Sequence, residues 1–504
     1  VALWLEPAKR TELCAWAFPF FYATVMMALE IERRAGTPGL EPGLNDRNPT
    51  TTLNKDDVNL GRWRHALLAI LVLAFAIRIF ALVATSPTPL ANDERHYHAQ
   101  AVEWVAGGEL GEARGRPPGI VIFYAALARI FGDSINVPRA GNAILGVVVV
   151  WLVAQLGALV GGRRVGLAAA ALCAFYPSMI AFSHYLWSEM LYLVFALGAL
   201  ILVLRDRGAS TRWRLAAAGF LMGLAALTRE VGLVAALALA CFLVWDSRES
   251  LRRGVLAAAT VLVVCGATIL PWSIHLHQTT GHVRLVSRTT WTNLYVGNSA
   301  PGERHSVMAY RSLGETRTER DVIARKKALR AIAMRMPWWP IEKLVEVRDL
   351  FAPTSYFERR LLEPPNSRTA LGEPRLWRYH FRWSSLDASL VRRMGALIAL
   401  ASYVAVAVAG VVGLVLMRNA SALVGFALFS LSQIGPTLIT FASSRFRMPL
   451  IPLLLIGAAL LMTSGPALWR EASGRRRMVA LQAGLVMIAI LFWGREASRL
   501  LIYL

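Results

Sequence analysis

Residues 66–84 read ALLAILVLAFAIRIFALVA, an apolar run interrupted only by Arg78. As a helix, such a run is long enough to cross the hydrocarbon core of a bilayer, which is about 30 Å thick. Further runs of this kind lie near residues 143–160, 165–181, 188–204, 215–228, 231–245, 255–274, 395–417, 421–441, 448–463 and 478–493. The sequence therefore predicts an all-α polytopic membrane protein with about eleven transmembrane helices.

The composition supports this fold class. The 504 residues are 56% hydrophobic and only 17% charged, which is far too apolar for an ordinary soluble domain of this length. A formal net charge of +22 would suggest nucleic acid in a soluble protein, but here the basic residues lie in short loops between apolar runs. We therefore expect the lipid bilayer as a partner and no nucleic acid.

The basic loops also predict the orientation of the chain. If the first span starts inside, the arginine-rich segments all face the cytoplasm: 61–65, 161–164, 205–214, 246–254, 417–420 and 465–477. The short loops of the opposite face contain only Arg229, Arg445 and Arg447, which stand against this bias. These three arginines need another explanation.

Long loops on the outer face divide the chain into parts. Residues 61–274 form an N-terminal transmembrane module containing the loop 85–142, residues 275–393 form a mainly helical outer insert, and residues 394–504 supply the C-terminal transmembrane helices. Within the insert, 317–336 has the period of an amphipathic helix, which we expect along the membrane surface. Residues 1–60 are an N-terminal extension that could hold an extra span, a signal-like segment or residues foreign to the native protein.

The loop after the first span contains the stretch Asn92-Asp93-Glu94-Arg95-His96-Tyr97. A carboxylate in a partly desolvated cleft can act as a general base, and Asp93, Glu94 and His96 could instead hold a divalent metal ion. Consecutive helical residues point about 100° apart, so Asp93 and Glu94 need not face one ligand. If the two carboxylates have no catalytic role, they lie at a solvated helix N-terminus that Asn92 or Asp93 caps.

The same loop continues with Gly115-Arg116-Pro117-Pro118-Gly119. Two prolines of fixed φ follow Arg116, whose guanidinium group matches phosphate in geometry and charge. Arg229, Arg445 and Arg447 would join it in an anion-binding surface at the lipid boundary. Taken alone, Arg116 is equally well explained as an ordinary interfacial arginine.

Two patterns in this loop, Asp93-Glu94-x-x-Tyr97-x-x-x-Ala101 and Arg116-Pro117-Pro118-Gly119, resemble the C-type (GT-C) membrane glycosyltransferases. Within that superfamily they are most similar to the bacterial relatives of protein O-mannosyltransferases and to the lipid A aminoarabinose transferases. Further similar stretches follow in the same order: 175–178 with 188–189, 227–229, 293–298 and 444–449. The resemblance covers about residues 61–465 and implies a GT-C fold.

The resemblance implies transfer of a sugar from a polyprenyl-phosphate carrier to an acceptor at the outer face. The acceptor could be lipopolysaccharide or lipid A, another cell-envelope glycan, a glycolipid or a protein. Asp93 would be the base that deprotonates or orients the acceptor hydroxyl, with Glu94 and Glu189 as further carboxylates. Glu189 is also explained as an acidic residue that the dipole of a helix N-terminus favours.

The resemblance assigns the carrier phosphate to arginines, namely Arg116, Arg445, Arg447 and, with less support, Arg229. Tyr97 could stack on the sugar or pack in the core. No cofactor follows from the motifs, apart from the divalent metal cation that the acidic pair could hold. We expect a multi-pass protein of the bacterial inner membrane with its active site facing the periplasm.

A polyprenyl-lipid transporter or flippase is the alternative. It would also need many spans and a phosphate-binding patch. Such a protein usually carries ionisable residues in mid-membrane and two halves of similar pattern. Neither feature is evident in the sequence.

Overall fold

A computed structural model describes residues 55–84, 93–107, 116–205, 212–281, 283–298, 306–353 and 388–492. Within these ranges the regular elements are all helices and there is no β-strand, which confirms the predicted fold class. The N-terminal extension lies outside the described residues as far as residue 54, so its predicted alternatives stay predictions.

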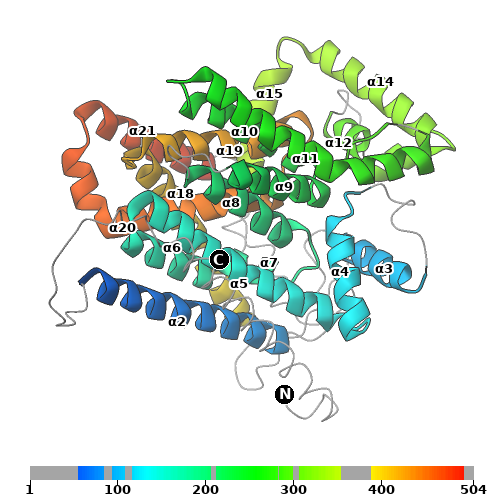
Figure 1. Cartoon of the computed structure of the whole chain (residues 1–504). Coiled ribbons are helices and arrows are strands. Elements are labelled where there is room, and N and C mark those ends of the chain that lie inside the picture. Colours follow the sequence, from blue (N-terminus) through cyan, green and yellow to red (C-terminus); the bar gives the residue numbers. More distant parts are fainter. Residues whose placement is uncertain are drawn as a thin grey trace.

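Each predicted span corresponds to a helix, and together these helices form a bundle (Figure 1). They are α2 (Lys55–Ala84), α5 (Asn136–Gly161), α6 (Arg163–Phe175), α8 (Glu189–Leu204), α9 (Arg212–Thr228), α10 (Val231–Asp246), α11 (Leu251–Thr280), α18 (Ala388–Leu416), α19 (Ala420–Ile439), α20 (Ile451–Glu471) and α21 (Gly474–Phe492). Six helical segments of the described ranges are long and apolar enough to cross a membrane by themselves, and α8 and α10 are shorter apolar helices. The chain is a multi-pass membrane protein.

One predicted span, 165–181, is divided in two. The helix α6 ends at Phe175, and the short helix α7 (Pro177–Phe182) begins after Tyr176, which has an extended backbone. Proline disfavours helical geometry in the residue before it and is well tolerated at the start of a helix, so Pro177 ends one helix and begins the next. The break moves the chain sideways before α8 begins at Glu189.

Arg78, the charge within the first span, is fully buried. Its Nε donates to Ser183 Oγ at 3.0 Å, and its Nη1 donates to Ala74 O at 3.0 Å. A Cβ atom on Gly146 would lie 2.6 Å from Arg78 Nε, so only glycine leaves room for this side chain to pass α5. Arg78 therefore joins α2 to the segment after α7.

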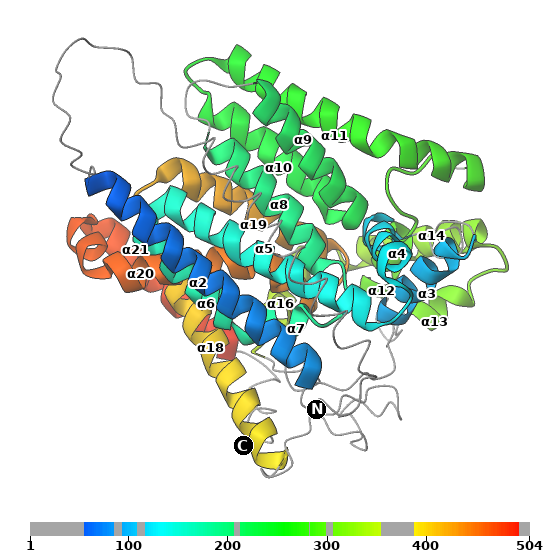
Figure 2. The ribbon, with the colours of Figure 1, turned by 60° about the horizontal axis from the view of Figure 1, so that its bottom comes forward.

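The loop after α2 contains α3 (Asp93–Val105) and α4 (Gly119–Phe131). The outer insert contains α12 (Thr290–Gly297), α13 (Val307–Arg311), α14 (Arg317–Arg335), α15 (Trp339–Val345) and α16 (Val347–Phe351). The shorter helices α3, α4 and α12 lie with α14 toward one end of the bundle, to the right in Figures 1 and 2. The turn between α5 and α6 at Gly162, which is one of the arginine-rich connections, lies toward the opposite end of the bundle (Figure 1).

The predicted amphipathic helix at 317–336 is confirmed as α14. Thr316 caps it by accepting a hydrogen bond from the backbone N–H of Glu319. Its small face, including Ala324 and Ala328, is buried in a second apolar core with α12 and α13. The next helix begins at Trp339, and Pro340 is compatible with its first turn.

The helices α18 and α20 contact each other closely in the C-terminal part of the bundle. On α18, a Cβ atom on Gly413 would lie 1.9 Å from the carbonyl oxygen of Gly457 on α20, and one on Gly410 would lie 2.5 Å from Leu454 O. Small residues let membrane helices approach until their backbones touch. These glycines therefore set how near α18 and α20 can lie.

Replacing Gly413 should destabilise the protein. Gly413→Ala would force α18 away from α20, and overpacking of this kind typically lowers the free energy of unfolding by about 1–3 kcal/mol. Thermal unfolding of the protein in detergent measures the change. The matched control is Gly266→Ala on α11, where a Cβ atom would meet nothing within 4 Å, and its melting temperature should be unchanged or higher. Equal melting temperatures for the two variants would contradict the assigned contact.

Candidate active site

Asp93, the first residue of α3, pairs with two arginines. Its Oδ1 lies 2.7 Å from Arg116 Nη1, and its Oδ2 lies 2.7 Å from Arg445 Nη1. Arg116 directly precedes the two prolines that lead into α4, and Arg445 lies in η1 (Ser444–Leu450), a 3-10 helix that leads into α20. The site thus joins an early loop to a late span.

Glu189 is the second carboxylate of the site. Its side chain is 1% exposed, and it begins α8. Arg445 binds it with two nitrogens, through Nε to Oε1 and through Nη2 to Oε2 at 3.1 Å. Arg229, between α9 and α10, lies 2.6 Å from Oε1 through its Nη1 and also donates to Ser188 Oγ. Arg445 therefore bridges the two carboxylates.

These five residues form what we call the ion-pair cluster: Asp93, Glu189, Arg116, Arg229 and Arg445. Three guanidinium groups against two carboxylates leave an excess of one positive charge. Such an excess in a partly desolvated site favours the binding of an anion. The structure brings together five of the residues that the sequence predicted for the site.

Aromatic rings support the guanidinium groups of the cluster. The guanidinium carbon of Arg445 lies 4.1 Å from the ring centre of Trp187, and that of Arg116 lies 5.3 Å from the ring centre of Tyr97. A cation over an aromatic face is stabilised by the ring quadrupole, more strongly where water is scarce. Tyr97 is buried, so its contact with Arg116 fits a packing role better than an open sugar platform. The sequence analysis missed Trp187, although it lies two residues before Glu189.

The arginines control the ionisation of Asp93. Burial alone would raise the pKa of this carboxyl, but Arg445 and Arg116 outweigh it and hold the pKa well below its usual range. Asp93 is therefore ionised at neutral pH. In this state it is also a weak base, because its lone pairs are committed to the guanidinium groups.

Glu94 contacts a different partner from Asp93. It is fully buried, and its Oε1 accepts a hydrogen bond from the backbone N–H of Leu186 at 3.1 Å. The different directions of Asp93 and Glu94 agree with the angle expected between consecutive helical residues. Glu94 thus fixes α3 against the segment that leads to Trp187 and Glu189.

The structure does not gather the predicted metal ligands Asp93, Glu94 and His96 into one group. Among the described residues, no group of three or more His, Cys, Asp or Glu side chains is placed to hold a metal ion. Both Asp93 oxygens face guanidinium groups, which repel a cation, and Glu94 is engaged with Leu186. In this arrangement Asp93 and Glu94 do not converge on one ion, and the predicted divalent cation stays a prediction.

Arg447 differs from Arg445 in its surroundings. It is buried, its guanidinium carbon lies 3.8 Å from the ring centre of Tyr403 on α18, and its Nη1 donates to the carbonyl of Ala352 after α16. Tyr403 in turn donates to Phe351 O at 2.8 Å. These contacts join η1 to the insert and to α18, so they suit a structural role.

Residues 115–275 match the family model of dolichyl-phosphate-mannose-protein mannosyltransferase. The matched segment covers less than half of the chain, and it is similar to this family of mannosyltransferases. It contains Arg116, Glu189 and Arg229, and the match confirms the resemblance predicted from the motifs. No curated protein matches the chain.

Two solved structures are among those to which the chain is similar. The oligosaccharyltransferase of Archaeoglobus fulgidus, in complex with Zn and sulfate, is 16% identical with a TM-score of 0.47, over 84% of this chain and 52% of that one. ArnT of Cupriavidus metallidurans, bound to undecaprenyl phosphate, is 15% identical with a TM-score of 0.38, over 81% of this chain and 80% of that one. This chain spans about half the length of the archaeal protein.

Loss of the Glu189 charge should destabilise the protein strongly. Glu189→Gln would leave Arg229 and Arg445 facing each other without their shared counter-charge, and breaking a buried pair typically lowers the free energy of unfolding by about 3–5 kcal/mol. Denaturant unfolding in mixed micelles measures it. As a control, Asp349→Asn removes an ion pair whose side chains are 41% and 51% exposed, and should change stability by less than about 1 kcal/mol. A similar small loss in both variants would contradict the assigned burial.

Proposed function

We propose that this chain is a glycosyltransferase that moves a sugar from a polyprenyl-phosphate donor to a cell-envelope acceptor. The acceptor class is lipopolysaccharide or lipid A, another glycan, or a protein. The observation that carries the proposal is the ion-pair cluster, in which a carboxylate lies between two arginines beside the ends of membrane helices. The family match over residues 115–275 supports the same donor class.

The cluster suits a lipid-linked phosphate. The guanidinium groups of Arg116, Arg229 and Arg445 present several donors in fixed planes, as phosphate oxygens require. Membrane helices of the bundle carry exposed apolar side chains for lipid, such as Phe80 on α2 and Leu270 on α11. A polyprenyl phosphate would thus leave its chain among lipids and its phosphate at the arginines.

The reaction needs one base and a stabilised leaving group. The acceptor oxygen forms a bond to the anomeric carbon of the sugar while the bond from that carbon to the phosphate oxygen breaks. Asp93 takes the proton of the acceptor hydroxyl, and the carrier leaves as a polyprenyl phosphate with one more negative charge. Fixed guanidinium groups near that charge lower the barrier.

The ion pairs of Asp93 imply an exchange when the donor binds. The donor phosphate competes with Asp93 for Arg116 and Arg445. As these arginines turn to the phosphate, the cause of the lowered pKa of Asp93 weakens and its basicity rises. Donor binding would therefore prepare the base, and Asp93 would stay unreactive while the site lacks a donor.

The proposed location is the bacterial inner membrane, with the cluster facing the periplasm. The arginine-rich connection between α5 and α6 lies toward the opposite end of the bundle (Figure 1), and such connections would face the cytoplasm. Glycosylation at the outer face needs a lipid-linked donor because nucleotide sugars stay inside the cell. The orientation and the donor class are thus mutually consistent.

Loss of the base should abolish transfer. Asp93→Asn keeps the size of the side chain but removes proton acceptance, and we expect transfer to fall by about 10²–10⁴-fold. Mass spectrometry of envelope lipids, glycans and proteins incubated with a panel of polyprenyl-phosphate sugars measures it. The control is Asp133→Asn, an exposed acidic residue between α4 and α5, which should keep full activity.

Two outcomes would contradict the proposal. One is unchanged transfer by a folded Asp93→Asn protein, which would remove Asp93 as the base. The other is absence of transfer by the unchanged protein together with movement of polyprenyl lipids across reconstituted bilayers. That result would favour a flippase.

The exchange of ion pairs predicts two different pH profiles. The profile of kcat/KM for the donor reports the free enzyme, in which the pKa of Asp93 is strongly lowered, whereas kcat reports the donor complex. Because Asp93 must be ionised to act, the acid-side fall of kcat should lie at higher pH than that of kcat/KM. If kcat and kcat/KM fall at the same pH on the acid side, the arginines stay paired with Asp93 when the donor binds, and the proposed exchange is wrong.

A further inference from the structure

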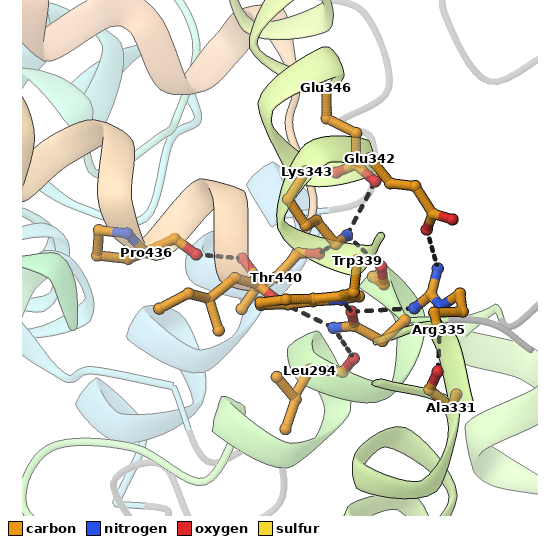
Figure 3. Close-up of polar contacts among 12 residues, drawn as sticks. Leu294, Ala331, Arg335, Trp339, Glu342, Lys343, Glu346, Pro436 and Thr440 are labelled. Atoms are coloured by element: carbon orange, nitrogen blue, oxygen red, sulfur yellow. Dashed lines mark hydrogen bonds and ion pairs between the residues drawn. The ribbon is translucent and has the colours of Figure 1, made fainter. Parts of the chain in front are cut away.

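One stretch of the sequence, Asn293–Asn298, has no role in the chemistry above. It forms the end of α12 in the insert, and the structure places its last two residues against the end of α19. Figure 3 shows side chains of α14 and α15 converging on the same place, around Thr440. Three segments distant in sequence therefore meet where α19 ends.

Asn298 is fully buried, and its side-chain amide both donates and accepts hydrogen bonds. Its Nδ2 donates to Leu294 O and to Ile439 O, both at 2.9 Å. Its Oδ1 accepts from Trp339 Nε1 at 2.8 Å and from Arg335 Nη2 at 3.3 Å. The amide thus ties α12 to the last residue of α19 and to the insert.

Lys343 on α15 is the second tie. Its ammonium group is buried and donates to Gly297 O at 2.6 Å, to Thr440 O at 3.1 Å and to Glu346 Oε1 at 2.8 Å. The last carbonyls of a helix lack partners within the helix and favour a nearby cation. Lys343 and Asn298 therefore complete the end of α19 in place of further helical residues.

Gly297 permits this arrangement. A Cβ atom at this position would lie 1.7 Å from Thr440 O, so any other residue would push α12 away from the end of α19. We call the contacts of Asn298 and Lys343 with Ile439 and Thr440 the clasp.

The clasp lies close to the active site along the chain. Only the residues from Phe441 to Ser443 separate Thr440 from η1, and Arg445 is the second residue of η1. We propose that Asn298 and Lys343 are positioning residues that hold the end of α19 so that Arg445 reaches both Asp93 and Glu189. Arg445 binds the donor phosphate under the proposed function, so the inference rests on that function.

The first test measures phosphate binding. Binding of a polyprenyl monophosphate to the full-length protein in micelles gives a Kd for the unchanged protein and for Lys343→Met and Asn298→Asp. The aspartate keeps the two accepted hydrogen bonds but cannot donate to Ile439 O. Each variant should weaken binding by about tenfold or more, since a charged or buried hydrogen bond is lost. The control Lys326→Met, an exposed lysine of α14, should leave Kd unchanged.

A double-mutant cycle tests whether the effect passes through Arg445. In an Arg445→Met background, Lys343→Met should change the Kd by less than about twofold, because the residue it positions is already gone. A merely structural role of Lys343 would instead give the same fold-change with and without Arg445. That outcome would overturn the inference.

Amide hydrogen exchange tests the clasp without a ligand. Exchange of residues 440–446 should quicken at least tenfold in Lys343→Met, while that of α14 stays unchanged. If the unchanged protein fails to bind the polyprenyl phosphate, the proposed function fails and the positioning role falls with it. If it binds and the variants bind equally well, only the clasp inference is overturned.

Discussion

The structure depends on one guanidinium group placed between two carboxylates. Arg445 joins Asp93 to Glu189, and it can do so only if the start of α3, the start of α8 and the η1 helix meet at one point. Burial penalises each of these charges alone, and their mutual attraction together with shared hydrogen bonds compensates for it. Two features of the chain lie next to the remaining partners. The break between α6 and α7 precedes Glu189, and the proline turn follows Arg116.

The sequence predicts the fold class well because lipid imposes a simple rule. Every apolar run must become a helix that satisfies its own backbone, so the predicted spans all correspond to helices. It predicts the candidate site partly. Arg229 and Arg445 are candidates because they oppose the positive-inside bias. Asp93 and Arg116 are candidates because their loop resembles that of the C-type glycosyltransferases. The structure brings these four together with Glu189.

The sequence does not predict the direction in which a side chain points. Asp93 and Glu94 are neighbours in the chain, yet one faces arginines and the other a backbone N–H, so a shared metal ion could not be judged from spacing. Arg445 and Arg447 are two residues apart and have different surroundings, because a 3-10 helix turns them to different elements. The clasp was also beyond sequence reasoning, since its parts come from α12, α15 and α19 and meet only after folding.

The wide separation of the cluster along the chain has a consequence for biogenesis. Asp93, Arg116, Glu189 and Arg229 are all synthesised before α18 begins, whereas Arg445 lies between α19 and α20. A ribosome-bound chain that has inserted only its first spans lacks Arg445. In such a chain Glu189 would have Arg229 as its counter-charge, and Asp93 would have Arg116. The late helix α20 must then enter between α6 and α18, which it contacts, to deliver the missing charge. The ion-pair cluster would thus be completed only when the C-terminal helices have joined the bundle.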